Sequence, residues 1–185
     1  PVLASNIAKI NAATDVSVDA TAVSVVSGTE GDVHSVLMSA SVGGVDFTLA
    51  GVDAVSARLS DSTSVTASKV KDLDGKTAGD VNITTATAIG GSAADIASVV
   101  GSSGVTFSAT SLVATASAGS AEASDLTSID GKLDSTVVAT SVTEITGTAG
   151  ELVTAVGAAG VSLANTVAVT VDSGTATVDQ IRNTL

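Results

Sequence analysis

One segment of the chain carries aspartates at alternate positions around a glycine. Asp72, Asp74 and Asp80 surround Gly75. Such spacing is typical of Ca²⁺ loops, because this cation takes several oxygen ligands and the glycine allows a sharp turn. The distal bidentate Glu of an EF-hand is missing, and Asp–Gly pairs are also ordinary turn residues at a helix end. The segment is therefore either a calcium site with these three aspartates as ligands or a helix end that needs no metal.

The chain offers few side chains for enzymatic chemistry. His34 is the only histidine, and there is no cysteine. Neither a zinc site nor a Ser–His–Asp triad therefore has a convincing set of partners. Glycine-rich pieces such as Gly90-Gly91 lack the patterns of phosphate-binding loops. We expect no enzymatic activity and no catalytic or cofactor-binding residues, and calcium is the one ion that the sequence leaves open.

Hydroxyl side chains recur at one position of the strands expected below. Stacked parallel strands would space these hydroxyls about 4.8 Å apart, and a flat row of threonines can bind ice or sugars. Threonine also suits the solvated face of any sheet because it is β-branched. The row is therefore either a binding face or an ordinary wet surface. Its members are Thr21, Thr48, Thr84, Ser108 and Thr140.

Glycine-anchored segments reveal an internal repeat. Gly28, Gly91 and Gly147 open three similar segments, which lie 63 and 56 residues apart. Shared offsets in independent columns are hard to obtain by chance and indicate a repeat architecture. Three further columns with the same offsets are Ile10, Leu73 and Ile129; Val18, Val81 and Val137; and Val26, Ile89 and Ile145.

These offsets define the expected domain organisation. We predict a single solenoid domain over residues 1–185, with repeats at about 10–72, 73–128 and 129–184, and with 1–9 as the tail of a preceding repeat. The first repeat holds about three extra residues, which we place within 51–67. Each repeat divides into two halves of about 28 residues, and each half has room for one strand and one helix.

Each repeat also contains a recognisable helix start. A Ser or Thr stands three residues before an acid, which is the spacing of a capping box, and the acid interacts favourably with the helix dipole. Glycines after the apolar run are expected to end each helix in a left-handed conformation. The predicted capping pairs are Thr29 with Asp32, Ser92 with Asp95, and Thr148 with Glu151.

Short alternating segments indicate the strands. An apolar residue recurs at every second position, so one side of each segment is dry and the other is wet. Strand, helix and strand in series imply parallel pairing with right-handed crossovers. We predict an α/β repeat solenoid with about six strands in a one-sided parallel sheet and about seven helical segments on its other face. The strands begin at Val18, Val45, Val81, Val105, Val137 and Val161.

The surface is strongly acidic and the core is aliphatic. Nineteen acids against seven bases give a net charge of −12, and the 185 residues include two phenylalanines but no tryptophan or tyrosine. An acidic surface repels phosphate backbones, so nucleic acid is not expected as a partner. No apolar run is long enough to cross a bilayer, so no membrane insertion is expected. Small aliphatic side chains suit the regular layers of stacked repeats.

Alanine, threonine and valine dominate segments such as Asp19-Ala20-Thr21-Ala22-Val23 and Val167-Ala168-Val169-Thr170-Val171. With these segments the whole chain resembles the Ala/Thr/Val-rich tandem repeats of giant bacterial cell-surface or secreted proteins. The resemblance implies an extracellular or cell-surface location and a role as an adhesin, a surface-layer component or an extracellular fibre. The unit length is also similar to that of leucine-rich repeats, although their LxxLxLxxN consensus is absent.

Both ends of the sequence lie in repeat phase. Val2 and Leu3 open the chain, and Val178, Ile181 and Leu185 share one expected helix face. A solenoid without polar caps exposes apolar surface, so we expect the partner to be the chain itself, head to tail, or neighbouring repeats of a longer chain. The predicted function is a structural spacer or adhesin, or a self-assembling filament or surface-layer subunit. The alternative is a module that binds ice, glycan or protein through the hydroxyl row.

Overall fold

The computed structural model describes the chain except for residues 16–17, 21, 40–46, 49–54 and 173–185. The chain divides into two compact units. Unit 1 contains Pro1–Ala86 and Ser102–Ser108, and unit 2 contains Thr87–Gly101 and Ala109–Leu185.

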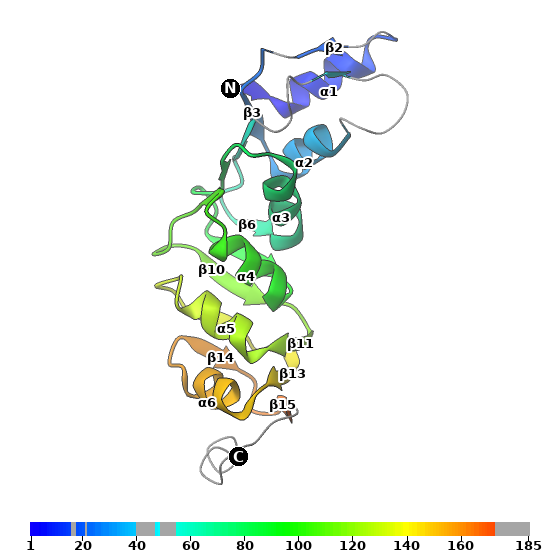
Figure 1. Ribbon diagram of the computed structural model, residues 1–185. Helices are drawn as coiled ribbons and strands as arrows, with labels where there is room; N and C mark the ends of the chain where they lie inside the picture. Colours follow the sequence, from blue (N-terminus) through cyan, green and yellow to red (C-terminus); the bar gives the residue numbers. More distant parts are fainter. Residues whose placement is uncertain (16–17, 21, 40–46, 49–54, 173–185) are drawn as a thin grey trace. The chain divides into compact units, whose positions relative to one another are not determined.

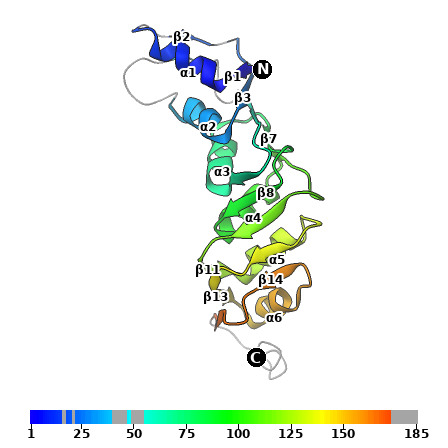
Figure 2. The ribbon, with the colours of Figure 1, turned by 180° about the vertical axis from the view of Figure 1, so that it is seen from behind.

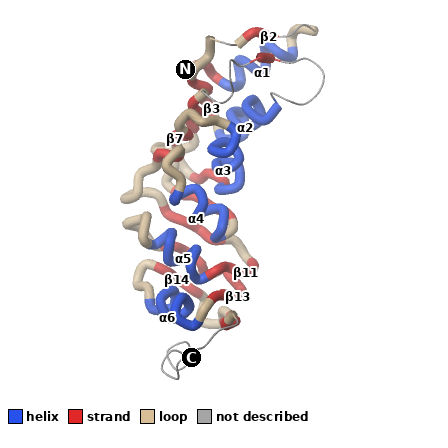
Figure 3. Tube along the Cα trace, in the orientation of Figure 1, coloured by secondary structure: helices blue, strands red, loops and turns tan. Residues whose placement is uncertain are grey.

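The described residues of each unit contain three helices, which pack in chain order. Figures 1 and 3 show this arrangement. In unit 1 they are α1 (Ala4–Ala12), α2 (Glu30–Ser39) and α3 (Ala67–Lys76), and in unit 2 α4 (Ala93–Gly101), α5 (Ala123–Asp130) and α6 (Ala149–Gly157). The starts of α1, α3 and α5 are 63 and 56 residues apart, and so are the starts of α2, α4 and α6. These separations equal the offsets found in the sequence. The seventh predicted helical segment falls outside the described residues.

The main sheet of unit 1 is parallel, with the strand order β1-β3-β5-β7-β9. Its inner column includes Val26, Ala57 and Val81, which are fully buried. A second, two-stranded sheet pairs β2 with β4, and β6 (Ser64–Thr66) leads directly into α3. The strand bounds are β1 (Val2–Leu3), β2 (Val18–Asp19), β3 (Val25–Gly28), β4 (Phe47–Thr48), β5 (Ser56–Leu59), β7 (Val81–Asn82) and β9 (Val105–Thr106).

Unit 2 places its strands in two parallel ladders. One ladder runs β8-β10-β12-β14 and the other β11-β13-β15. The inner column of the second ladder contains Ala121, Ile145 and Val169 in register. The strand bounds are β8 (Ala88–Gly91), β10 (Val113–Ala116), β11 (Gly119–Glu122), β12 (Val137–Ala139), β13 (Val142–Gly147), β14 (Val161–Leu163) and β15 (Ala168–Val171).

The predicted α/β class and parallel pairing are confirmed, but the single one-sided sheet is wrong. The described residues contain fifteen strands in four sheets. The six predicted strands correspond to β2, β4, β7, β9, β12 and β14. Glycine interrupts the apolar alternation in four of the strands that were not predicted, β3, β8, β11 and β13. A turn at residues 140–141 separates β12 from β13, which therefore belong to different sheets.

The predicted helix caps are confirmed. The backbone N–H of Asp32, Asp95 and Glu151 donates to the hydroxyl of Thr29, Ser92 and Thr148 respectively. Thr148 and Glu151 form a reciprocal capping box, since the N–H of Thr148 donates to Glu151 Oε2 at 2.8 Å.

We expected glycines with a positive φ at the ends of the helices, but such glycines lie before the helix starts. Gly101 and Gly157 close α4 and α6 without a positive φ. Positive φ values occur instead one residue before each cap, at Gly28 (152°), Gly91 (156°) and Gly147 (150°). Only glycine adopts this conformation readily. The anchoring glycines of the sequence repeat therefore turn the chain into a helix rather than out of one.

Candidate functional sites: apolar faces, a polar junction and a polar row

The first elements of unit 1 expose an apolar surface. Val2, Leu3 and Ile10 are 37%, 52% and 54% exposed. β1 pairs with β3 and forms the edge of its sheet, so its other side offers unpaired backbone groups. Lys9 is the only charged side chain in α1 and precedes the exposed Ile10.

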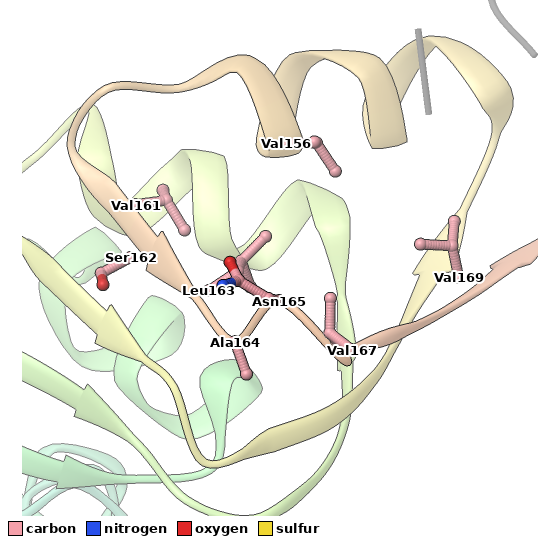
Figure 4. Close-up of a pocket in the computed structure, with 8 residues that line it drawn as sticks. All are labelled: Val156, Val161, Ser162, Leu163, Ala164, Asn165, Val167 and Val169. Carbon is pink, nitrogen blue, oxygen red and sulfur yellow. The ribbon is translucent and has the colours of Figure 1, made fainter. Parts of the chain in front are cut away.

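The last described elements of unit 2 expose a second apolar surface. Val156 and Val171 are 42% and 46% exposed. Between α6, β14 and β15 lies a groove of about 700 Å³, shown in Figure 4. β14 and β15 each form the edge of a sheet. The groove is lined by Val156, Val161, Ser162, Leu163, Ala164, Asn165, Val167 and Val169.

These two surfaces account for every large exposed hydrophobic side chain among the described residues. The helices at the two surfaces carry opposite charges, since the charged side chain of α1 is Lys9 and that of α6 is Glu151. Acids follow in both units, at Asp15 and Asp19 after α1 and at Asp172 after β15.

A buried acid forms a polar junction in unit 1. Glu30 begins α2 and is only 6% exposed. Its Oε1 lies 3.0 Å from Lys69 Nζ, and its Oε2 accepts the Thr66 N–H. Asp61 Oδ2 accepts the N–H of Glu30 at 2.6 Å. The junction thus connects the start of α2 to the β5–β6 loop and to the start of α3. The neighbouring helices α1 and α3 instead begin with buried alanines, Ala4 and Ala67.

The three predicted calcium ligands are not brought together. Asp72 pairs with His34, at 3.3 Å between Oδ2 and Nε2. Asp74 Oδ2 accepts the Ser102 hydroxyl at 2.8 Å, and the backbone carbonyl of Asp80 accepts the Ala57 N–H. Within the described ranges, no three His, Asp or Glu residues are placed to hold a metal ion.

The predicted hydroxyl row does not follow the strands. Thr84 and Thr140 are exposed in turns after β7 and β12, and Ser108 is half-buried in the loop after β9. Thr48 lies in β4, and Thr21 lies outside the described residues. Thr84 and Thr140, which the alternation pattern predicted on strands, therefore lie in turns.

A different polar row lies on the outer side of the unit 1 sheet. The strand register places Ser27, Arg58, Asn82 and Thr106 next to one another. Alternation in the sequence marks Asn82 and Thr106 as outward residues. Ser27 and Arg58 lie on strands that alternation does not predict, so the row emerges only from the sheet register.

Two carboxyl groups of unit 2 have shifted pKa values. The backbone N–H and then the hydroxyl of Thr148 donate to Glu151 and lower its pKa. Burial, and secondly the charge of Glu122, raise the pKa of Asp125 in the first turn of α5. Both carboxyl groups lie in the first turn of a helix, so their ionisation is coupled to helix stability.

No protein-family model matches the chain, and no curated protein or solved structure matches it either. None of the described helices combines the length and the hydrophobicity that a membrane span requires.

Proposed function

We propose that this chain is a non-enzymatic structural segment built from tandem repeats in a bacterial cell-surface or secreted protein. It stacks end to end on further repeats, supplied either by a longer chain or by a second copy. The observation that carries this proposal is the confinement of large exposed apolar side chains to the first and last described elements.

The spacing of the helices supports a repeated unit. Two series of helix starts share the 63- and 56-residue separations. Repeat proteins bury their apolar flanks only against neighbours, so terminal units without polar caps expose them. The open edges of β1, β14 and β15 belong to parallel sheets, which a further parallel strand can extend.

The opposite charges of α1 and α6 favour a head-to-tail contact. A contact between Lys9 on the first surface and Glu151 on the second is attractive, whereas two copies of the same helix would bring like charges together. Head-to-tail contacts are heterologous and propagate into fibres unless they close into a ring. This arrangement suits a spacer or a filament subunit.

Sedimentation velocity over a wide concentration range tests the proposal. The chain is expected to form larger species as its concentration rises. Leu3→Glu should suppress them, because a carboxylate buried in an apolar seam is costly. Ala94→Glu, an exposed position on α4 with the same charge change, should leave association unchanged. A strict monomer at every concentration, or equal association of both variants, would contradict end-to-end stacking.

A further inference from the structure

The outer row of the unit 1 sheet runs across four consecutive parallel strands. Ser27 on β3 is opposite Arg58 on β5, which is opposite Asn82 on β7, and Asn82 is opposite Thr106 on β9. Figure 2 shows β3 and β7 from behind. Neighbouring strands lie about 4.8 Å apart, so the row presents polar groups at that interval. No acid interrupts it.

The row consists mainly of hydrogen-bond donors. Asn82 Oδ1 accepts both the N–H and the hydroxyl of Thr84, at 3.1 and 2.8 Å, which leaves its amide nitrogen as the outward group. Arg58 is exposed. Within the described part of the chain its guanidinium forms no ion pair or hydrogen bond.

A groove lies beside the guanidinium. It has a volume of about 320 Å³ and its lining includes three hydroxyl side chains. The Thr85 hydroxyl donates to the Leu59 carbonyl at 3.1 Å, which fixes one wall of the groove. The guanidinium therefore borders a concave surface rather than a flat one. The lining residues are Pro1, Ser27, Arg58, Leu59, Ser60 and Thr85.

We propose that this row and groove bind an acidic polysaccharide, with Arg58 holding a carboxylate of the sugar chain. A guanidinium matches the two oxygens of a carboxylate. Ser27, Asn82 and Thr106 supply neutral hydrogen bonds to hydroxyl groups of adjacent sugars, whose spacing in an extended chain is close to that of the strands. Nucleic acid fits less well, because its binding relies on several cations along a phosphate backbone.

The row adjoins the apolar surface of β1, because Leu3 is opposite Ser27 and the Ser27 hydroxyl donates to the Val2 carbonyl at 3.4 Å. Arg58 lies on β5, two strands away from β1, so the Arg58→Gln variant tests this site and the Leu3→Glu variant tests the end-to-end contact. The acidic surface opposes the approach of an anionic ligand over long range. At about 0.15 M salt that repulsion is screened beyond about 8 Å, whereas the direct contact with Arg58 persists.

The test is a titration of the full chain with a short oligomer of galacturonic acid, followed by ¹H–¹⁵N correlation spectra at about 0.15 M salt. Signals of Ser27, Arg58, Asn82 and Thr106 should shift. Arg58→Gln should weaken binding about tenfold, the usual effect of losing one charge-assisted contact. Lys132→Gln removes the same charge from an exposed turn of unit 2 and should leave the affinity unchanged.

Two further ligands distinguish the contribution of the carboxylate from that of the sugar chain. The same oligomer with its carboxylates methyl-esterified should bind about as weakly as the acid form binds to Arg58→Gln. Acetate at an equal carboxylate concentration should compete poorly, because it cannot reach the neighbouring strands. Absence of binding, equal binding of the esterified oligomer, full competition by acetate, or an unchanged affinity of Arg58→Gln would each overturn the proposal. Thermal melts of each variant verify that it is folded.

Discussion

The Asp130 carboxylate at the end of α5 lies against the backbone of Gly160, so that a Cβ at position 160 would overlap its Oδ1. The same relationship recurs in unit 1, where Asp74 lies against Gly104. There Ser102 reinforces it by donating its hydroxyl to Asp74 and accepting the Gly104 N–H at 3.0 Å. The aspartates that resemble calcium ligands in the sequence thus include one member, Asp74, that secures the next strand connection.

Gly160→Ala is therefore expected to destabilise unit 2 by about 1 kcal/mol, because the new methyl group must displace the Asp130 carboxylate. Gly157→Ala is the matched control, since a Cβ there meets nothing within 4 Å, and it should be neutral or slightly stabilising. Urea unfolding measures both. Combining Gly160→Ala with Asp130→Ala should recover part of the loss, and strict additivity of the two substitutions would contradict the contact.

Thr148→Ala should destabilise the protein by about 1 kcal/mol, the usual contribution of an N-cap. Ser92→Ala is expected to have an effect of similar size. Because Thr148 lowers the pKa of Glu151, that carboxylate stabilises the folded state above its unfolded pKa. This contribution is lost as the pH falls through the folded pKa, so the difference between wild type and Thr148→Ala should narrow in acid. Unfolding midpoints that do not move would contradict the capping box.

Glu30→Ala should lower stability by about 1–3 kcal/mol, because the Thr66 N–H and Lys69 lose their acceptor. We expect this loss even though alanine stands at the start of the neighbouring helices α1 and α3. Lys69→Met should have a larger effect, since it leaves a buried carboxylate without its cation. The double variant should be more stable than the sum of the two losses implies. A double-mutant cycle measures this coupling, and a coupling energy of zero would argue against the junction.

Asp125→Asn should stabilise unit 2 at neutral pH. Burial and Glu122 raise the pKa of Asp125, so the ionised carboxylate is less favourable in the folded chain than in the unfolded one. The wild-type protein therefore loses stability as the pH rises from the pKa of Asp125 in the unfolded chain to its higher pKa in the folded chain. The extra stability of Asp125→Asn should appear above this pH range and vanish below it. Thermal melts from pH 3 to 7 test the sign. A gain that persists unchanged at the lowest pH would contradict this cause.

Calcium should not be required for folding. Asp72 is paired with His34 and Asp74 with Ser102, so these carboxylates already have partners. Melting temperatures with added Ca²⁺ and with a chelator are expected to agree. If the chelator lowered the melting temperature by many degrees, Asp72, Asp74 and Asp80 would again be candidate calcium ligands.

Part of this structure could be predicted from the sequence, because it depends on interactions between residues that are close in the chain. Capping at Thr29, Ser92 and Thr148 depends on residues three positions apart, so spacing alone located the starts of α2, α4 and α6. The six strands with a clear apolar alternation were found for the same reason. The 63- and 56-residue offsets anticipated the spacing of the helices, because equivalent residues meet equivalent local rules.

Tertiary structure decided what depends on contacts between distant residues. Glu30 becomes buried beside Lys69 only when α2 and α3 pack together, and Arg58 joins Ser27 and Asn82 only through the register of three strands. Shifting a strand by one residue would turn each side chain to the opposite face. No local pattern specifies that register, so the polar junction, the outer row and the division into several sheets followed from the folded chain alone.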